Sequence, residues 1–119
     1  MITLNLRTND AGVFCLHFQY LIEYLVEGKQ KEEVNWPLVH TLNNLFLKME
    51  KISDIVDDVL PVELTEEEAR IFYFTLTQKK YLEALEANPE AMEGSFYGSL
   101  LLIKEKMIYQ LEAKLKTAA

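Results

Sequence analysis

Seven acidic side chains and no basic one occur between residues 54 and 68, in the segment DIVDDVLPVELTEEE. They are the side chains of this protein best suited to bind a cationic group, because carboxylates form charge-assisted hydrogen bonds with lysine and arginine. Glu66–Glu68 follow Thr65 in the first turn of an expected helix, where the helix dipole favours negative charge. The three aspartates before them are expected in the last turn of the preceding helix, where the dipole disfavours them. They are therefore the more informative part of the run.

Three interpretations of these aspartates remain open. A spacing of i, i+3 and i+4 places their carboxylates on one helical face, which would suit Mg²⁺ or Ca²⁺, although the segment lacks the D-x-D-x-D-G loop of an EF-hand. A solvated acidic surface without a function is the simplest interpretation. The third is a docking surface for a basic protein partner. Its predicted residues are Asp54, Asp57, Asp58, Glu63, Glu66 and Glu67.

Histidine and cysteine offer little chemistry. Cys15 and His17 are two positions apart on an expected helix, hence about 200° apart around its axis, and cannot bind one metal ion together. His40 has no other ligand-type residue at a suitable spacing. A Cys15 nucleophile would require a positioned base, and its surroundings, VFCLHF, indicate a core position. Common nucleotide-binding, zinc-protease and serine-hydrolase motifs are also absent. We therefore expect no enzymatic activity, no cofactor and no bound metal.

The charge balance narrows the choice of partners. The chain of 119 residues has a net charge of −7, and only Arg7 and Arg70 of its twelve basic residues are arginine. An acidic surface repels nucleic acids and anionic membranes, so we expect neither as a direct partner. The first residues, MITLNLRTND, do not have the pattern of a signal peptide, and a single cysteine cannot form an internal disulfide. These features predict a cytoplasmic protein.

An internal repeat is the strongest architectural signal. Residues 4–18 and 62–76 align at an offset of 58, with the pairs Leu6/Leu64, Ala11/Ala69 and Phe14/Phe72 identical. We infer two strand–helix–helix units, approximately residues 2–59 and 60–117, within one domain that covers 1–119. A short strand followed by two helices cannot bury its apolar faces alone, whereas two such units can pack on one another.

The sequence thus predicts a mainly α, four-helix domain with a small two-stranded ribbon. Alternation predicts a strand at residues 2–6 and another at 62–64, and segments 4–6 and 62–64 are expected to pair. Helices are expected over 11–26, from 35–37 until shortly before Pro61, over 65–87 and over 96–115. Asn88-Pro89 predicts a helix start, either of a short turn or of the last helix.

Two helical segments, Ile71–Leu76 and Leu100–Ile103, are apolar over more than one face. Such helices are either central in a fold or shared with a partner, and the latter predicts a homodimer or another permanent protein contact. The preferred function is a non-enzymatic interaction module that regulates or inhibits another protein by covering its basic surface, as small acidic inhibitors from phages and mobile elements do. The alternative is a structural subunit of a virion or complex. A metal-dependent enzyme with a site between the two units is the third hypothesis.

Overall fold

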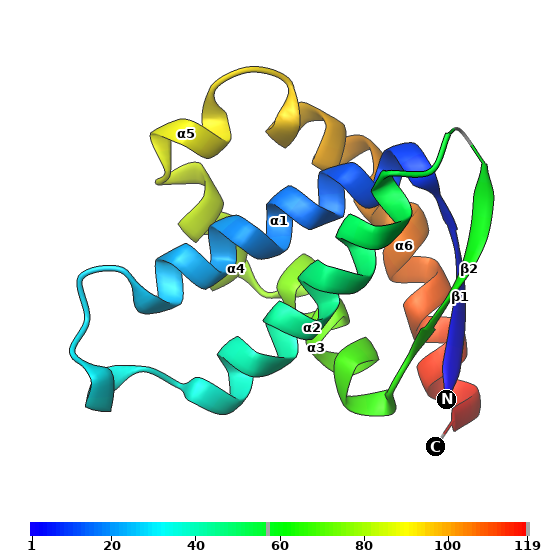
Figure 1. Cartoon of the computed structure of the whole chain (residues 1–119), viewed down its shortest axis with the longest axis horizontal. Coiled ribbons are helices and arrows are strands. Elements are labelled where there is room, and N and C mark those ends of the chain that lie inside the picture. The colour runs from blue at the N-terminus through cyan, green and yellow to red at the C-terminus, as the bar shows by residue number, and fades with distance from the viewer. Residues whose placement is uncertain (57, 119) are drawn as a thin grey trace.

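β1 (Ile2–Arg7) and β2 (Val59–Leu64) pair as an antiparallel ribbon, with Leu4 opposite Val62 at its centre. The computed structural model describes residues 1–56 and 58–118. Figure 1 shows the ribbon at one side of a helical body, with the N-terminus and the C-terminus near the same end of it. The predicted two-stranded ribbon is confirmed, although Leu4 and Val62 are the only residues of the expected segments 4–6 and 62–64 that lie opposite each other among the described residues. β2 is longer than expected, because Val59, Leu60 and Pro61 extend it toward its N-terminal end.

The helices surround a core that the ribbon closes on one side (Figure 1). In chain order they are α1 (Thr8–Val26), the 3₁₀ turn η1 (Lys31–Glu33), α2 (Trp36–Ser53), α3 (Glu66–Thr77), α4 (Lys79–Glu86), α5 (Pro89–Met92) and α6 (Phe96–Ala118). α1 and α2 pack along one another, and α6 packs against α3, α1 and β1. Within the described residues, no helix is both long and apolar enough to span a membrane.

Helix boundaries follow local chemistry at several of the expected places. The Thr65 hydroxyl accepts the Glu68 N–H at 3.0 Å, and the Glu68 carboxylate accepts the Thr65 N–H at 2.8 Å, which completes a capping box at α3. The side chain of Asn35 caps α2 by accepting the Leu38 N–H. Gly28, with φ of 73°, adopts the left-handed conformation just after α1 that glycine tolerates best.

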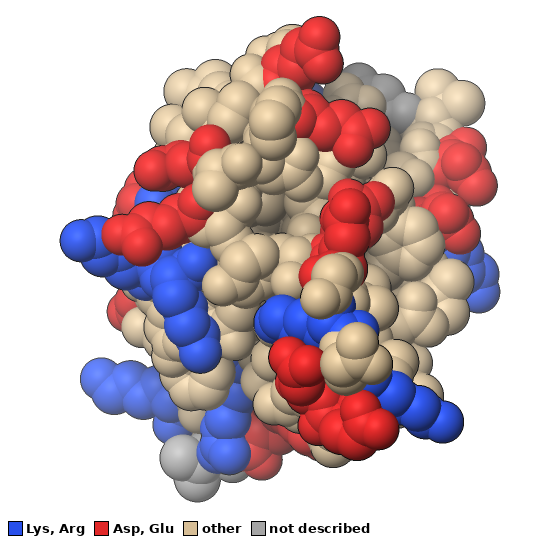
Figure 2. Space-filling view, turned by 90° about the vertical axis from the view of Figure 1, so that its left-hand side faces the viewer, with Lys and Arg blue, Asp and Glu red and all other residues tan. Residues whose placement is uncertain are grey.

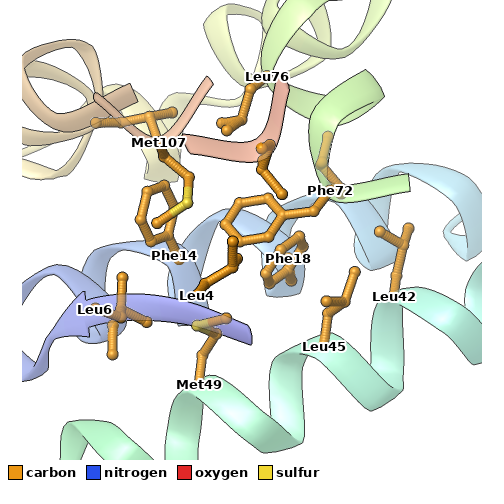
Figure 3. Packing of buried hydrophobic residues seen from close by; sticks show 14 of the residues in the cluster. Leu4, Leu6, Phe14, Phe18, Leu42, Leu45, Met49, Phe72, Leu76 and Met107 are labelled. Carbon is orange, nitrogen blue, oxygen red and sulfur yellow. The ribbon is translucent and has the colours of Figure 1, made fainter. Parts of the chain in front are cut away.

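Three phenylalanine rings form the centre of the core. The ring of Phe72 lies 5.0 Å from those of Phe14 and Phe18, edge to face in both cases, and all three side chains are buried. Figure 3 shows Leu4 of β1 directed at this cluster and Leu45 of α2 closing it from below. Burial of these large rings against aliphatic side chains from both strands and several helices is the main force that holds the fold together.

The described residues form six α-helices instead of the expected four, because the predicted helix over residues 65–87 is divided in two and the short helix α5 follows it. α3 ends at Thr77, Gln78 is extended, and α4 begins at Lys79. Two threonines near this break bond back to their own helix: the Thr75 hydroxyl donates to the Phe72 carbonyl and the Thr77 hydroxyl to the Tyr73 carbonyl. Such local bonds compete with continued helix, and here they accompany its end.

The second helix is shorter than expected and ends at Ser53 instead of running toward Pro61. Its predicted last turn is replaced by a connection and by the first half of β2. Thr8, the first residue of α1, ties this connection to the helix. The Thr8 N–H donates to the Asp58 carbonyl at 2.9 Å, and its hydroxyl accepts the Asp58 N–H at 3.1 Å.

Candidate functional site

A cleft of about 570 Å³ lies between the C-terminal end of α1 and the segment that joins α4 to α5. Its lining contains three carboxylates and neither lysine nor arginine. The residues that line it are Glu23, Tyr24, Glu27, Ala84, Ala87, Asn88, Pro89 and Glu90. The small side chains of its floor leave the carboxylates and the tyrosine as the groups available to a partner.

Two neighbouring elements bring these carboxylates together. Glu23 and Glu27 are one helical turn apart on α1, so they occupy the same face. The last turn of α1 contains no basic residue to offset them or the negative end of the helix dipole. Glu90 enters from the opposite wall, where the Asn88 side chain accepts its N–H at 3.0 Å and so fixes the start of α5. The described lining of the cleft therefore has acidic side chains on both sides and no basic one.

One tyrosine close to the cleft, Tyr20, responds to these acids. Burial raises the pKa of Tyr20, and the charges of Glu90 and Glu23 raise it further. The ring of Tyr24, which is half exposed, has the ammonium group of Lys29 at 5.4 Å from its centroid. An aromatic face attracts a cation at this distance, so Lys29 illustrates the kind of group that the wall of the cleft can bind.

The groups that line the cleft are of the kind that bind cationic side chains. Carboxylates bind lysine and arginine by charge-assisted hydrogen bonds, and an aromatic ring beside them adds a favourable surface. The cleft lining offers no nucleophile and no histidine: His17 is fully buried in the core and His40 lies on the exposed side of α2. Among the described residues, no group of three or more histidine, cysteine or acidic side chains is arranged to hold a metal ion.

Figure 2 shows the side of the molecule that carries η1, α4 and α5. Acidic and basic side chains are interspersed over this surface, and neither sign covers it completely. The cleft is thus a local negative site within a mixed surface. A partner that fits it must present a local cation, since a broad basic face would also meet the lysines.

The acids that the sequence predicts as a docking surface are divided between the two ends of β2. Asp54 and Asp58 lie before the strand, whereas Glu63 is near its end and Glu66 and Glu67 follow it. A strand of six residues separates its ends by roughly 17 Å, so the two groups do not form one cluster. Asp57 lies outside the described residues.

The expected single helical face of aspartates is wrong, because α2 ends before them. Asp54 is the C-cap residue that follows the end of α2 at Ser53, and Asp58 immediately precedes β2. The Asp58 carboxylate accepts the Val59 N–H at 2.8 Å, so it caps the free start of the strand. This contact explains one acid of the run by a structural role.

The glutamates at the other end have different surroundings. Glu66 forms an ion pair with Arg70 one turn along α3, and Glu67 is exposed. The carbonyl of Glu63 accepts a hydrogen bond from the Lys48 ammonium at 2.9 Å, while its side chain is on the exposed side of the strand. Of the three predicted docking residues at this end of β2, Glu66 has an ion pair. Glu63 and Glu67 have none with a described residue.

Sequence reasoning missed the cleft because its acids come from segments more than sixty positions apart. A local signal was nevertheless present: Glu23 and Glu27 occur one turn apart just before Gly28, at a helix end without a basic residue. What the sequence does not reveal is that α5 brings Glu90 to face them. That placement depends on the break after α3, which redirects the chain.

Comparisons with known proteins identify no relative. No model of a protein family matches the sequence, and searches of curated proteins and of solved structures found no match either.

Proposed function

We propose that this chain is a non-enzymatic interaction module that regulates or inhibits another protein by binding a basic segment of it. The observation that carries the proposal is the acidic cleft between α1 and α5, whose described lining includes three carboxylates and no lysine or arginine. Acidic side chains at the C-terminal end of α1 are unfavourable to the helix dipole, and a lysine or arginine from a partner would relieve that cost.

The target in this proposal is a protein with a basic groove, such as one that binds nucleic acid. A net charge of −7 steers the chain toward such a surface, and small acidic inhibitors of the phage type act in this way. The interspersed charges of Figure 2 favour insertion of one basic side chain into the cleft over imitation of a whole nucleic-acid backbone. The proposed place of action is the cytoplasm, where Cys15 would remain reduced.

The test is capture of partners from the native lysate on tagged protein, with parallel washes at about 0.1 M and about 1 M salt. The same captures use the triple variant Glu23→Gln, Glu27→Gln, Glu90→Gln. The matched control is Glu32→Gln, Glu50→Gln, Glu105→Gln, which removes the same number of charges from exposed positions outside the cleft. We expect a partner that the wild type and the control retain at low salt, and that the cleft variant and high salt both release.

Two outcomes would reject the proposal. A partner that the cleft variant binds as well as the wild type does would remove the cleft from recognition. A partner retained fully in 1 M salt would indicate an apolar interface, since screening at that salt shortens the Debye length from about 10 Å to about 3 Å.

The acids around β2 remain a second predicted docking surface. Replacing Asp54, Asp57 and Asp58 by asparagine tests one end of it, and replacing Glu63 and Glu67 by glutamine tests the other. If the partner is released by these changes and not by the cleft variant, recognition uses the ends of β2 instead.

The alternative function is a structural subunit that assembles through apolar helix faces, as a homodimer or within a larger complex. The observation that favours it is on α6, where Leu102 is 82% exposed and Tyr109, two turns further along, is 78% exposed. Tyrosine and leucine at such positions are well suited to a permanent contact. Size-exclusion chromatography of wild type and of Leu102→Ser, Tyr109→Ser tests it: this hypothesis predicts an oligomer that the variant abolishes and that salt does not affect.

We also propose that residues 2–59 and 60–117 are copies of one ancestral unit. Supporting this, the ribbon pairs Leu4 with Val62, the rings of Phe14 and Phe72 are in contact, and His17 bonds to Thr75. Each of these pairs is separated by 58 positions, as expected where equivalent residues meet near a two-fold axis. The division of the second unit into α3, α4 and α5 is the main departure from symmetry.

A further inference from the structure

The two outer edges of the ribbon differ in whether their backbone groups are hydrogen-bonded by the rest of the protein. On β1, the Asn5 N–H donates to Oε1 of Gln110 at 2.6 Å, and Nε2 of Gln110 donates to the Asn5 carbonyl at 3.1 Å. One side chain from α6 therefore makes both hydrogen bonds that a residue of a neighbouring strand would make. This edge is closed by the protein itself.

The outer edge of β2 has backbone groups of the same kind. Asn5 is opposite Pro61, and residues of an antiparallel pair alternate in direction, so Val59, Pro61 and Glu63 direct their backbone groups outward. The Val59 N–H is taken by Asp58 and the Glu63 carbonyl by Lys48. No described residue bonds to the Pro61 carbonyl or to the Glu63 N–H. The Val59 carbonyl has no bond to a described residue either, so two acceptors and one donor of this edge are left to solvent.

The residue on α2 that corresponds to Gln110 explains the difference. Glu63 is 58 positions after Asn5, and Ile52 is 58 positions before Gln110, so α2 presents an isoleucine where α6 presents an amide. The correspondence uses the offset of 58 positions proposed above, and Ile52 and Glu63 also line the same groove. The isoleucine side chain cannot form hydrogen bonds, so it does not bond to the backbone of β2 as Gln110 bonds to that of β1. An apolar groove lies beside the open edge instead.

The groove between α2 and β2 has a volume of about 340 Å³. Aliphatic side chains form most of its surface, and Ile55 at its mouth is 46% exposed. It is lined by Lys48, Lys51, Ile52 and Ile55 of α2 and the connection after it, and by Leu60, Pro61, Val62 and Glu63 of β2. Lys51 is exposed and has no ion pair with a described residue, whereas Lys48 is paired with Glu68.

We propose that this groove receives an extended peptide segment of a partner protein, which adds to β2 as a third strand. The peptide N–H donates to the Pro61 carbonyl, and a peptide carbonyl accepts the Glu63 N–H, as Gln110 does for Asn5 on the other edge. An apolar side chain of the peptide enters the groove against Ile52 and Ile55. Lys51 selects for an acidic residue next to that side chain, by charge complementarity.

This binding site is distinct from the acidic cleft and goes beyond the function proposed for it. The cleft is lined by α1, α4 and α5, whereas the groove is lined by α2 and β2. The two sites also prefer peptides of opposite charge. Failure of one proposal therefore leaves the other intact.

The test begins with a phage-displayed library of random dodecapeptides selected against the whole protein. Enriched peptides are synthesised, and their Kd is measured by fluorescence anisotropy for three proteins. Ile52→Gln supplies an amide at the position that corresponds to Gln110 and is expected to close the edge, which weakens binding at least tenfold. Leu47→Gln places the same amide on an exposed position of α2 outside the groove, and its Kd is expected to equal that of the wild type.

Amide hydrogen exchange of the wild type gives an independent readout that does not depend on folding of a variant. Bound peptide is expected to slow exchange of the Glu63 N–H at least tenfold. The proposal is overturned if no peptide is enriched, if peptides bind Ile52→Gln as tightly as the wild type, or if exchange at Glu63 is unchanged. A dimer of the wild type that Ile52→Gln abolishes would also overturn it, because the groove would then hold a second copy of the chain.

Discussion

Nε2 of His17 lies 3.0 Å from Oγ1 of Thr75, and both side chains are fully buried. Because the Thr75 hydroxyl donates its own proton to the Phe72 carbonyl, it can only accept from the imidazole. The proton of neutral His17 is therefore on Nε2. Nδ1 is left as a buried acceptor without a partner among the described residues. A second proton there would place an uncompensated charge in the core.

We predict that His17 makes the protein less stable in mild acid. Burial lowers its pKa from 6.5 to about 3, so below pH 6.5 the unfolded chain binds a proton that the folded chain does not. The free energy of unfolding should fall by about 1.4 kcal/mol per pH unit between pH 6 and 5, above the range in which most carboxylates titrate. Urea unfolding followed by circular dichroism at several pH values measures this slope.

The matched variants for this slope are His17→Gln and His40→Gln. The first removes the buried imidazole and should flatten the dependence on pH, even where its stability at pH 7 is lower. The second removes the exposed imidazole and should retain the wild-type slope. An unchanged slope in His17→Gln would show that another group causes the effect.

Glu68 should matter far more to stability than its neighbour Glu67. Its buried carboxylate accepts hydrogen bonds from the Thr65 N–H and, at 2.7 Å, from the Lys48 ammonium, which joins the start of α3 to α2. Glu68→Ala removes both contacts and should lower the free energy of unfolding by about 1–3 kcal/mol. Glu67→Ala, in the same turn and exposed, should change it by no more than about 0.5 kcal/mol. Chemical denaturation of both variants measures how much the capping box and the ion pair contribute to the free energy of unfolding.

The acids of the cleft should destabilise the protein that carries them. Glu23→Gln with Glu27→Gln relieves repulsion at the C-terminal end of α1 and should raise the free energy of unfolding by about 0.5–1 kcal/mol at low salt. Glu66→Gln with Glu67→Gln removes the same charge from the N-terminal end of α3 and should lower it. The difference between the two pairs should shrink in 1 M salt. Equal effects of both pairs would contradict a role for the helix dipoles.

Two aromatic residues of α3 should differ sharply on truncation. Phe72 is completely buried between Phe14 and Phe18, whereas Phe74 is 38% exposed. Phe72→Ala should cost about 3–5 kcal/mol, because it leaves a cavity at the centre of the core. Phe74→Ala should cost about 1 kcal/mol or less. Thermal unfolding of the two variants measures the contrast, and similar melting temperatures would argue against the core as described.

Local patterns explain which parts of this fold were predictable. Alternation of apolar residues predicted β1, and the capping box at Thr65 predicted the start of α3, because both depend on residues close in sequence. The end of α2 was not predictable in this way. Residues 52–56 keep helical spacing, and the chain leaves the helix because Val59 and Leu60 gain more by pairing with β1. The spacing of apolar residues does not predict the outcome of such competition between local and distant contacts.

The candidate sites also differ in whether they depend on residues close in sequence or on contacts between distant segments. Charge composition predicted an acidic docking surface, but it could not predict that β2 separates Asp54 from Glu66. The cleft depends on Glu90 of α5 and Glu23 of α1 lining the same opening. The groove depends on an isoleucine, Ile52, whose significance emerges only beside the Asn5–Gln110 contact on the opposite edge. These are relations between surfaces, and a sequence records them only indirectly.

The only tryptophan of the chain has an unusual position. The indole N–H of Trp36 donates to the Lys31 carbonyl at 3.0 Å and so ties η1 to the start of α2, with the ring partly open to solvent. Intrinsic fluorescence therefore monitors the junction of α1 and α2 and is nearly blind to the phenylalanine core. A change in emission that precedes the loss of helical circular dichroism would report this junction opening by itself, which makes the native chain its own local probe.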